Sequence, residues 1–495
     1  MRKNILKINQ NVAPVSDAME KYARDGALAF HTPGHKQGLG AHPLLSKLIT
    51  RDGLRQEVSL MEELDDLHDP QGCIKAAEEL AAELWGASDT LFMINGTTSA
   101  IQAMILGTLS PGDQVLVPRN AHRSIIGGLI LAGAVPVYLQ PEIIEPIGIA
   151  GCLSVETVQS AIEKYPEAKA LIAVYPTYYG MAGNLGEIAD LLHGKNMLLL
   201  VDEAHGAHLK FAASISGMPK QALDLGADVV AQSTHKVLGS LTQTSMLHIG
   251  SSMVLKAKIR KAASLLQTTS PNQLLLASLD IARLQMAEEG QERLKKAVDM
   301  ADWLRKEINN ISGLYCVGEE IIDKTNTFAL DRTRIVVNLT GLGVHGYEAE
   351  DILRHQYKVQ CELSDNYNMV FIISMADTEE TVSRLLEVLQ CLARDHGMPL
   401  MPLQPPPDVL FRPNNMAISP RDAFFGTGER MRFDEAVGCV SAETVAFYPP
   451  GVPVLCPGEI ISAALIEAVR KQQEQHLRVV GPEDSALEYI RVIKK

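Results

Sequence analysis

The sequence lacks closely spaced pairs of cysteines. Its seven cysteines are dispersed along 495 residues, and no two of them form a CxxC motif. An odd, scattered set argues against a disulfide framework and against a zinc ribbon, because both need regularly spaced partners. This usage is typical of a reducing compartment, so we expect a cytoplasmic protein.

Long apolar runs are also missing. Basic residues occur near the N-terminus, in MRKNILKINQNVAP, but no apolar stretch follows them, which argues against a secretory signal. The longest apolar stretch, residues 125–139, is shorter than the roughly 18 residues of a membrane span, and Pro136 interrupts it. We expect no membrane segment.

The chain has no excess of basic residues. It carries 45 lysines and arginines against 59 aspartates and glutamates, which gives a formal net charge of −14. Nucleic acids and anionic membranes both require a basic surface, so neither is expected as a partner. A small cationic substrate suits this charge better.

What the sequence does contain is enough apolar material for several folded domains. Hydrophobic residues make up 46% of the chain and charged residues 21%. At roughly 100–200 residues per domain, this length predicts about three domains. Along the chain we expect an N-terminal arm (1–60), a large domain (61–300), a small α/β domain (301–398), and a proline-rich linker followed by a C-terminal domain (399–495).

Short apolar segments alternate with helical stretches between residues 75 and 270. They are LFMI at 91, QVLVP at 114, VPVYL at 135, ALIAVY at 170, MLLLVD at 197, DVVAQ at 228 and MLHI at 246. This alternation predicts βα units that build a mostly parallel, helix-covered sheet. A long helix is expected over residues 272–310, and a second, smaller α/β pattern follows it.

One polar segment stands directly after the first of these strands. NGTTSA (95–100) offers a glycine and hydroxyl groups at the start of a helix, where unpaired N–H groups and the helix dipole favour phosphate. The same pattern is also typical of an ordinary helix N-cap. Because open α/β sheets bind ligands at the carboxyl ends of their strands, we keep this segment as a candidate phosphate site.

Two further strand ends carry groups suited to aldehyde chemistry. Lys236 follows DVVAQ and has apolar neighbours, and desolvation lowers the pKa of a lysine that must attack an aldehyde. Asp202 ends the strand MLLLVD, where an ionised carboxylate can keep a pyridine nitrogen protonated. Ser233 and His235 stand beside the lysine and are placed to reach a phosphate, while His122 can stack on a flat cofactor ring. These groups predict bound pyridoxal 5′-phosphate.

The same residues also allow other interpretations. The DEAH segment at 202–205 also occurs in helicases, but the chain has no GxxxxGK[ST] loop to bind the nucleotide. His205 and His208, joined by His31 and His35, are an alternative zinc set for a metal-dependent hydrolase. A catalytically silent protein that binds no cofactor is the third alternative. We expect no metal.

These residues belong to motifs through which the chain resembles the fold-type-I family of ornithine, lysine and arginine decarboxylases over nearly its whole length. The matching motifs are HTPGH (31–35), LDDLHDP (64–70), NGTTSA (95–100), PRNAH (118–122), YPTYYG (175–180), VDEAHGAH (201–208), STHK (233–236), SPRDAFF (419–425) and YPPGVPVLCPGE (448–459). The resemblance implies a pyridoxal-phosphate transferase-like fold with a seven-stranded sheet, a smaller α/β domain and a C-terminal α+β domain.

The resemblance also implies roles for individual residues. Lys236 would be the Schiff-base lysine, Asp202 the partner of the pyridine nitrogen and His122 the stacking residue. Phosphate would be bound by Thr97, Thr98, Ser233 and His235, with His205 and Thr177 near the cofactor ring. The family is dimeric at minimum with its site at the subunit interface, so Thr269 and Ser270 are expected to reach the phosphate of the partner subunit.

The start of the chain bears on substrate and assembly. Inducible bacterial members carry a wing domain before HTPGH, whereas this chain reaches HTPGH at residue 31. In this it is similar to the short biosynthetic arginine decarboxylases, which make agmatine for polyamine and spermidine synthesis. We therefore expect arginine as substrate and a homodimer or tetramer. Lysine, giving cadaverine, and ornithine, giving putrescine, are the alternatives.

Recognition of the substrate side chain is expected to use acidic residues. A guanidinium group prefers a planar carboxylate that accepts two hydrogen bonds, whereas an ammonium group accepts many oxygen arrangements. Asp65, Asp66, Glu362 and Asp365 lie in segments that the resemblance places near the mouth of the active site. Acidic residues in loops are also commonly just solvated.

Overall fold

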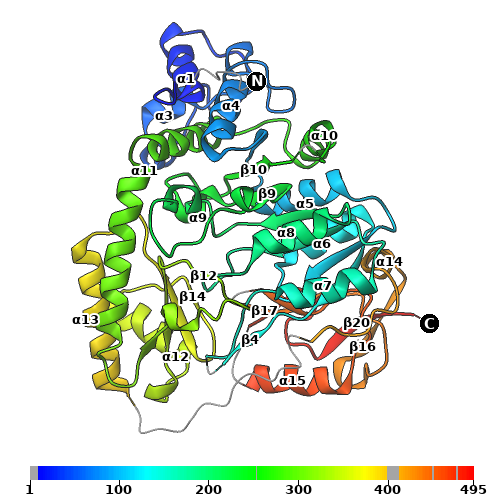
Figure 1. Cartoon of the computed structure of the whole chain (residues 1–495). Coiled ribbons are helices and arrows are strands. Elements are labelled where there is room, and N and C mark those ends of the chain that lie inside the picture. Colours follow the sequence, from blue (N-terminus) through cyan, green and yellow to red (C-terminus); the bar gives the residue numbers. More distant parts are fainter. Residues whose placement is uncertain are drawn as a thin grey trace. The chain divides into compact units, whose positions relative to one another are not determined.

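Seven strands form the central sheet in the computed structural model of the chain, which describes residues 9–145, 147–251, 253–397, 412–448, 451–474 and 478–494 (Figure 1). Their order is β1-β10-β9-β8-β6-β2-β3. They are β1 (Asp89–Met93), β2 (Gln114–Pro118), β3 (Val135–Leu139), β6 (Ala170–Val174), β8 (Leu198–Asp202), β9 (Val229–Gln232) and β10 (Ser245–Ile249). The predicted seven-stranded sheet is confirmed.

The sheet has the mostly parallel character that the sequence predicts, with one reversal. Strand β2 runs parallel to both β3 and β6, whereas β10 is antiparallel to β1 and to β9. Every residue of β9 and of β10 is buried. Such continuous apolar strands are typical of sheets covered by helices on both faces.

Helices follow the strands in the expected alternation, which can be traced from cyan to green in Figure 1. They are α5 (Gly96–Thr108) after β1, α6 (Arg123–Ala132) after β2, α7 (Val155–Lys164) before β6, and α8 (Leu185–His193) before β8. Each helix is therefore adjacent in sequence to a strand. The loops that precede α5 and α6 carry the candidate site motifs.

The chain divides into two units, which we treat separately. The first comprises Met1–Thr108, Val201–Phe211 and Gln221–Glu292; the second comprises Leu109–Leu200, Ala212–Lys220 and Arg293–Lys495. The four-part division expected from the sequence is a division along the chain and stays a prediction.

Outside the sheet, the first unit is helical. Its helices include α1 (Pro14–Asp25), α2 (Pro43–Leu48), α3 (Arg51–Gln56), α4 (Cys73–Trp85) and α10 (Lys256–Leu266). Three of these lie within the predicted N-terminal arm, and the segment 31–40 between them consists of turns and bends, as its glycines and proline indicate. The expected long helix is α11 (Gln273–Ile308).

The second unit contains an antiparallel sheet of order β11-β13-β15-β14. Its strands are β11 (Tyr315–Cys316), β13 (Arg334–Asn338), β14 (Leu363–Ser364) and β15 (Asn368–Ile372). Alternate residues of β13 face two different cores: Ile335 and Val337 pack with the end of α11 and with α13 (Glu379–His396), whereas Val336 packs in a second cluster. This period of two explains the apolar RIVVN run, since both faces are covered.

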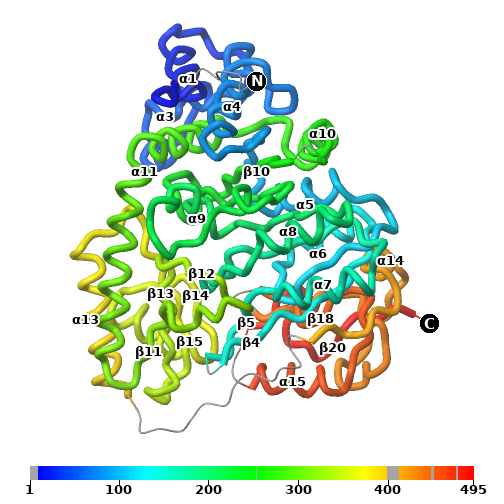
Figure 2. The backbone as a smooth tube through the Cα atoms, viewed as in Figure 1, coloured from blue at the N-terminus to red at the C-terminus, as the bar shows by residue number. Residues whose placement is uncertain are grey.

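The C-terminal part of the second unit has its own small core around Phe433, Val445 and Leu465. Its elements are α14 (Pro420–Phe425), β16 (Gly428–Arg432), β17 (Val445–Tyr448), β18 (Val452–Leu455), α15 (Ala463–Glu474), β19 (Arg478–Val480) and β20 (Tyr489–Ile493). Figure 2 follows this part from orange to red. The predicted proline-rich linker falls almost wholly outside the described residues. No helix in the described parts combines the length and the apolar character needed to cross a membrane.

Candidate active site

A group of buried hydroxyls lies at the start of α5. The Oγ1 atom of Thr97 is 2.5 Å from Oγ of Ser233 and 3.1 Å from Oγ of Ser245. Gly96 adopts φ +76°, which favours glycine, and nothing lies within 4 Å of where its Cβ would be. Thr98, one residue further on, is exposed. A helix N-terminus with hydroxyls beside it is suited to hold a phosphate group.

The lysine and the acid predicted from the sequence interact with each other. Asp202 is only 5% exposed, and burial raises the pKa of its carboxyl group, while Lys236 and the N–H of Ala204 act in the opposite direction. The Nζ atom of Lys236 lies 2.9 Å from Nε2 of His205. An ammonium group can only donate, so this contact requires a neutral His205 when the lysine is charged. The structure therefore brings these predicted residues together.

His235 is placed with one ring nitrogen already used. Its Nδ1 lies 2.6 Å from the carbonyl oxygen of Thr244, so Nδ1 must carry the hydrogen. Burial lowers the pKa of His235, and the charge of Lys236 adds to that effect, although the bond to Thr244 opposes it. In the neutral form Nε2 is then an acceptor. His235 can donate to a phosphate only when both nitrogens are protonated.

Two residues that the sequence did not single out join the strand ends. Glu203 directly follows Asp202, and Gln232 directly precedes Ser233. The Gln232 amide lies 2.6 Å from a Glu203 carboxylate oxygen, and both side chains are fully buried. This bond joins the residue before Ser233 to the residue after Asp202. The signal available in the sequence was a second carboxylate at a buried strand end.

The same network continues away from the site. The oxygen of the same Gln232 amide lies 3.1 Å from Nε2 of His248, and Nδ1 of that ring lies 2.8 Å from the Thr90 hydroxyl. His248 also stacks on Trp85, with ring centroids 5.6 Å apart. Burial lowers the pKa of His248 to about 3, so this ring is neutral. The network is therefore held by hydrogen bonds without a charged histidine.

The buried Glu203 predicts an unusual dependence of stability on pH. Burial raises the pKa of Glu203 to about 8, although bonds from Gln232 and Ala222 oppose the rise. The folded chain thus keeps a proton that the unfolded chain loses above about pH 4.3. Stability from this group is complete below that pH and falls as pH rises towards 8, by up to about 1.4 kcal/mol per pH unit.

We expect Glu203→Gln to remove this dependence. Flipping the Gln232 amide and moving the His248 proton to Nδ1 would keep every bond of the network satisfied in the variant. Thermal unfolding at pH 5, 6, 7 and 8 should show that the stability of the variant relative to the wild type increases as pH rises. The exposed Glu62→Gln is the matched control. Parallel curves for Glu203→Gln and the wild type would show that Glu203 is ionised in the folded state.

Asp65, a predicted substrate residue, is occupied by the backbone. Its carboxylate accepts from the N–H groups of Asp66, Gln71, Gly72, Ile74 and Lys75 at 2.8 to 3.2 Å. These bonds cap the start of α4. Asp66 accepts similarly from the N–H of His68, at 2.8 Å. The carboxylate of Asp65 is thus used for capping, and we do not include it among the groups proposed to bind substrate.

Replacing Asp65 with alanine should therefore lower stability and leave substrate affinity unchanged. A lost helix cap with a charged acceptor corresponds to about 2 kcal/mol of unfolding free energy. Urea unfolding measures this loss, and the KM for the substrate measures binding. A raised KM at unchanged stability would instead indicate that Asp65 binds the substrate.

Thr269 and Ser270 lie in an exposed segment that LDDLHDP holds in place. His68 contacts this segment twice, through Nδ1 at 2.7 Å from the Ser264 hydroxyl and through Nε2 at 2.9 Å from the carbonyl oxygen of Thr268. Both Thr269 and Ser270 are exposed in the single chain. Their contact with a partner subunit stays a prediction.

In the second unit, His122 caps a helix. It is the N-cap of α6, with Nδ1 3.2 Å from the N–H of Ser124 and 2.8 Å from the hydroxyl of the same residue. The ring is held at one nitrogen and is exposed. Stacking on a cofactor stays a prediction for it.

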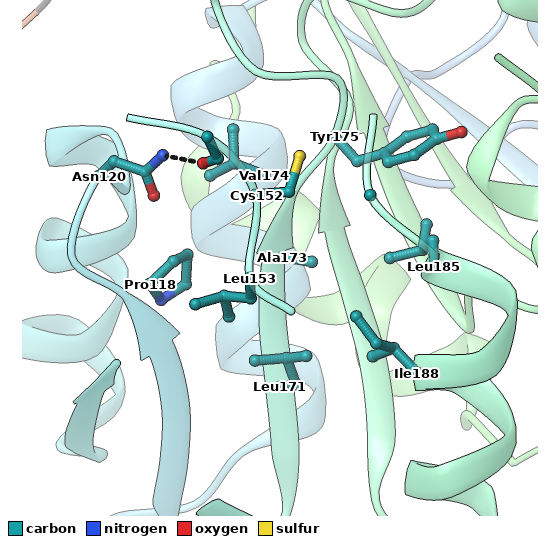
Figure 3. Close-up of a pocket in the computed structure, with 12 residues that line it drawn as sticks. Pro118, Asn120, Cys152, Leu153, Leu171, Ala173, Val174, Tyr175, Leu185 and Ile188 are labelled. Carbon is teal, nitrogen blue, oxygen red and sulfur yellow. Dashed lines mark hydrogen bonds between the residues drawn. The ribbon is translucent and has the colours of Figure 1, made fainter. Parts of the chain in front are cut away.

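A small cavity in the second unit is lined by residues of β2, of β6 and of the segments that follow them. Figure 3 shows Pro118, Cys152 and Leu185 among its lining, and the Asn120 amide donating to the carbonyl oxygen of Gly151 at 3.1 Å. Its volume of about 30 Å³ is that of about one water molecule. This mostly apolar cavity is too small for a substrate.

Tyrosines of the YPTYYG motif form hydrogen bonds to Glu362 and Asp365, the two predicted substrate residues in or near the small sheet. Thr177 is buried, and its hydroxyl accepts from the N–H of Met181 at 3.2 Å. Next to it, the Tyr178 hydroxyl donates to Glu362 at 2.8 Å. Glu362 is otherwise exposed. This contact leaves oxygen lone pairs of Glu362 available to a ligand.

Asp365, unlike Glu362, has its carboxylate oxygens occupied by several donors within the fold. It accepts from the Tyr179 hydroxyl at 2.7 Å, from the N–H groups of Tyr367 and Asn368, and from the Asn368 amide. Burial raises the pKa of Asp365, and these hydrogen bonds act against that rise. Like Asp65, it is used inside the fold, and we do not include it in the substrate proposal.

Two histidines of the alternative zinc set, His31 and His35, contact other side chains. Nε2 of His35 lies 2.7 Å from Glu57, and Nε2 of His31 lies 3.0 Å from the Tyr22 hydroxyl. Within the described ranges, no three His, Cys, Asp or Glu side chains gather in a way that could hold a metal ion.

Comparison with known proteins gives matches over almost the whole chain. The family model described as "Orn/Lys/Arg decarboxylase, major domain" matches residues 13–336, and the C-terminal domain model of the same family matches residues 409–479. An arginine decarboxylase of Halalkalibacterium halodurans is 40% identical over 490 residues, covering 98% of each chain. An arginine decarboxylase of Bacillus subtilis is 38% identical over 488 residues, covering 99% of each chain.

Among solved structures, the lysine decarboxylase of Francisella novicida is similar in fold. Its TM-score is 0.82 at 21% sequence identity, and the match covers 98% of this chain and 81% of that one. The expected fold class is thereby confirmed. The family model over residues 13–336 and the full-length relatives at 38% and 40% identity show that this chain belongs to the Orn/Lys/Arg decarboxylase family.

Proposed function

We propose that the chain is a pyridoxal 5′-phosphate-dependent decarboxylase that converts L-arginine to agmatine and CO₂. The observation that carries this proposal is Lys236, whose Nζ lies 2.9 Å from His205 and interacts with the buried Asp202. Arginine is favoured because the full-length relatives at 40% and 38% identity are arginine decarboxylases. The product would enter polyamine synthesis.

The residues of the first unit suit this cofactor. Thr97 and Ser233 offer buried hydroxyls at the start of α5, where a helix N-terminus favours phosphate. The space beside Gly96 admits a group close to the backbone. Lys236 offers an amine for an aldehyde, and Asp202 offers a carboxylate for a pyridine nitrogen. Such a set is typical of the pyridoxal-phosphate enzymes of this fold.

When bound, pyridoxal 5′-phosphate supplies an electron-withdrawing ring that accepts the electron pair left as CO₂ departs. Asp202 would keep the proton on the ring nitrogen, because an adjacent anion favours the protonated form. Lys236 would hold the cofactor through its amine, and His205 would fix the position of Nζ. Thr97, Thr98, Ser233 and protonated His235 would bind the phosphate.

In the second unit, we propose that His122 stacks on the cofactor ring and that Glu362 binds the guanidinium of the substrate. Glu362 is exposed, and Tyr178 holds one of its oxygens at 2.8 Å. A carboxylate fixed in this way can accept the parallel bonds that a guanidinium offers. Thr177, next to Tyr178, is proposed to lie near the ring. Asp66, exposed and partly engaged, is the weaker acidic candidate.

Glu362→Gln is expected to raise the KM for arginine about tenfold to a hundredfold, since a hydrogen bond to a charged group is lost. The kcat should change much less, because Glu362 binds the side chain and not the reacting carbon. Steady-state kinetics measures both. Glu387→Gln, an exposed carboxylate on α13, is the control. Equal KM values for the two variants would remove Glu362 from the site.

The cofactor is tested by colour and by trapping. Purified protein should absorb in the visible region, and borohydride should bleach it and leave a pyridoxyl group fixed on Lys236, found by peptide mass spectrometry. A colourless preparation that added pyridoxal phosphate does not colour would contradict the proposal and favour the silent alternative. Loss of activity to a chelator, with no effect of borohydride, would favour the metal-dependent hydrolase.

Substrate choice needs a separate measurement. Products from arginine, lysine and ornithine should be quantified side by side, with agmatine as the dominant amine. Dominance of cadaverine or putrescine would assign lysine or ornithine instead. Either result leaves the cofactor proposal standing, because all three reactions remove the same carboxylate.

We further propose a cytoplasmic homodimer or tetramer. The cysteines are free thiols, which suits a reducing compartment. In the assembly, Thr269 and Ser270 would reach the phosphate of the partner subunit. Sedimentation velocity measures the assembly, and a monomer at micromolar concentration would contradict it.

A further inference from the structure

Arg119, at the end of β2, is bound by a C-terminal motif. It is 2% exposed, and its Nη2 donates to Glu459 at 2.9 Å and to the carbonyl oxygen of Val454 at 2.8 Å. Its Nη1 lies 3.3 Å from Sγ of Cys456. All three partners belong to the segment VPVLCPGE. Arg119 of PRNAH, the first residue after β2, is thus held by a segment more than three hundred residues later in the chain.

Glu459 is equally buried. It is 0% exposed, and the oxygen that binds Arg119 also accepts from the N–H of Cys456 at 2.7 Å and from the Asn414 amide at 3.3 Å. An unpaired charge at such a position is very unfavourable, so each partner requires the other. The pair therefore fixes the start of the PRNAH loop in one place.

A second C-terminal motif binds the far end of the same segment. Arg421 of SPRDAFF donates from Nη1 to the carbonyl oxygens of Ile130 and Leu131, at 3.2 and 2.7 Å. These are carbonyls of the last turn of α6, which lack partners within the helix and attract a cation. Figures 1 and 2 show α14, which carries Arg421, beside α6.

Between the two contacts lies His122, the N-cap of α6. We propose that the C-terminal part of the chain positions His122, by holding residues 119–132 at one end through Arg119 and Glu459 and at the other through Arg421. This inference rests on the proposed function for what His122 contacts. Arg119, Glu459 and Arg421 are positioning residues, since they act through the segment that carries the histidine.

The alternative is that these contacts only stabilise the C-terminal fold, and Arg470 offers a matched control. Its guanidinium binds Asp434 at 2.8 Å and the carbonyl oxygen of Leu487 at 3.0 Å, and it lies over the ring of Phe433. All of these partners are C-terminal. Arg470→Ala should therefore destabilise that fold without reaching residues 119–132.

The first test uses hydrogen exchange of the full-length chain without added cofactor. Arg421→Ala and Glu459→Gln should speed amide exchange in residues 119–132 about tenfold, because a helix end or a buried pair is released. Arg421→Lys should restore the wild-type rates, since it keeps the cation. Arg470→Ala should leave this segment unchanged. Equal exchange in 119–132 for Arg421→Ala and Arg470→Ala would overturn the proposal.

The second test uses pyridoxal phosphate itself. We expect the concentration for half-maximal visible absorbance to rise about tenfold in Arg421→Ala and Glu459→Gln, and to stay unchanged in Arg470→Ala. Unchanged half-saturation and an unchanged absorption maximum in the first two variants would contradict positioning of His122. Should the wild type itself bind no pyridoxal phosphate, the proposed function fails, whereas faster exchange in 119–132 would still show that the C-terminal motifs hold this segment.

Discussion

Lys236→Ala is expected to lower kcat/KM for arginine by about 10³-fold or more, because the variant has no amine to hold the cofactor or to release the product. The lysine lies in the short helix α9 (Thr234–Val237) that comes after β9, and its Nζ is held 2.9 Å from His205. Among the described residues, Lys236 is the cation that lowers the pKa of Asp202. Steady-state kinetics measures the loss, and borohydride followed by peptide mapping should find no pyridoxyl group at this position.

A surface lysine separates this effect from a general loss of charge. Lys258→Ala removes an exposed lysine of α10 and should keep both the activity and the adduct on Lys236. Because Asp202 is buried opposite Lys236, the alanine variant also leaves a carboxylate without its cation, so its thermal unfolding should be recorded alongside. Activity of Lys236→Ala within tenfold of the wild type would assign the chemistry to another residue.

Much of the sheet was predictable because burial leaves a local pattern. Each of the seven strands is a short, largely apolar run, which is typical of strands buried within a sheet. The strand ends were predictable for the same reason: Asp202 is the polar last residue of the apolar strand β8, and Lys236 lies shortly after the buried strand β9. Their proximity then follows from topology, because neighbouring strands β8 and β9 carry them.

The antiparallel direction of β10, in contrast, was not predictable from the sequence. The segment between β9 and β10 contains only the four-residue helix α9 (Thr234–Val237) and loops, and its length is at the lower limit for a parallel crossover. The sequence shows this spacing, but the run THKVLG resembles the start of a longer helix. Local apolar pattern therefore predicts the strand and not its direction.

Roles that depend on distant partners were not predictable. Asp65 has the sequence surroundings of a substrate residue, yet its oxygens are used by backbone N–H groups up to ten residues later. Glu203 and Gln232 are bonded across strands, and Arg119 meets Glu459 340 residues further on. Sequence indicates that such polar residues are buried and need partners, but only the fold identifies the partners.

The second large effect is expected for Asp202→Asn. Asparagine has nearly the same shape and can still accept from the N–H of Ala204, which Asp202 does at 3.1 Å. An amide carries no charge, however, so it cannot hold a proton on the pyridine nitrogen. Loss of such a preorganised charge should lower kcat for arginine about 10³-fold. Borohydride should still fix a pyridoxyl group on Lys236, which distinguishes this variant from Lys236→Ala.

The control and the pH profile make this test decisive. Asp224→Asn changes a nearby carboxylate that binds Lys210 and Gln221, and it should leave kcat unchanged. Burial raises the pKa of Asp202 while Lys236 lowers it, so in the wild type the charged form depends on the lysine. In the wild type, protonation of Asp202 should lower the rate at low pH. The residual rate of the asparagine variant should show no such decrease, because asparagine does not titrate. A variant with kcat within tenfold of the wild type would show that the ring nitrogen needs no anion here, and would assign Asp202 to holding β8 and β9 together.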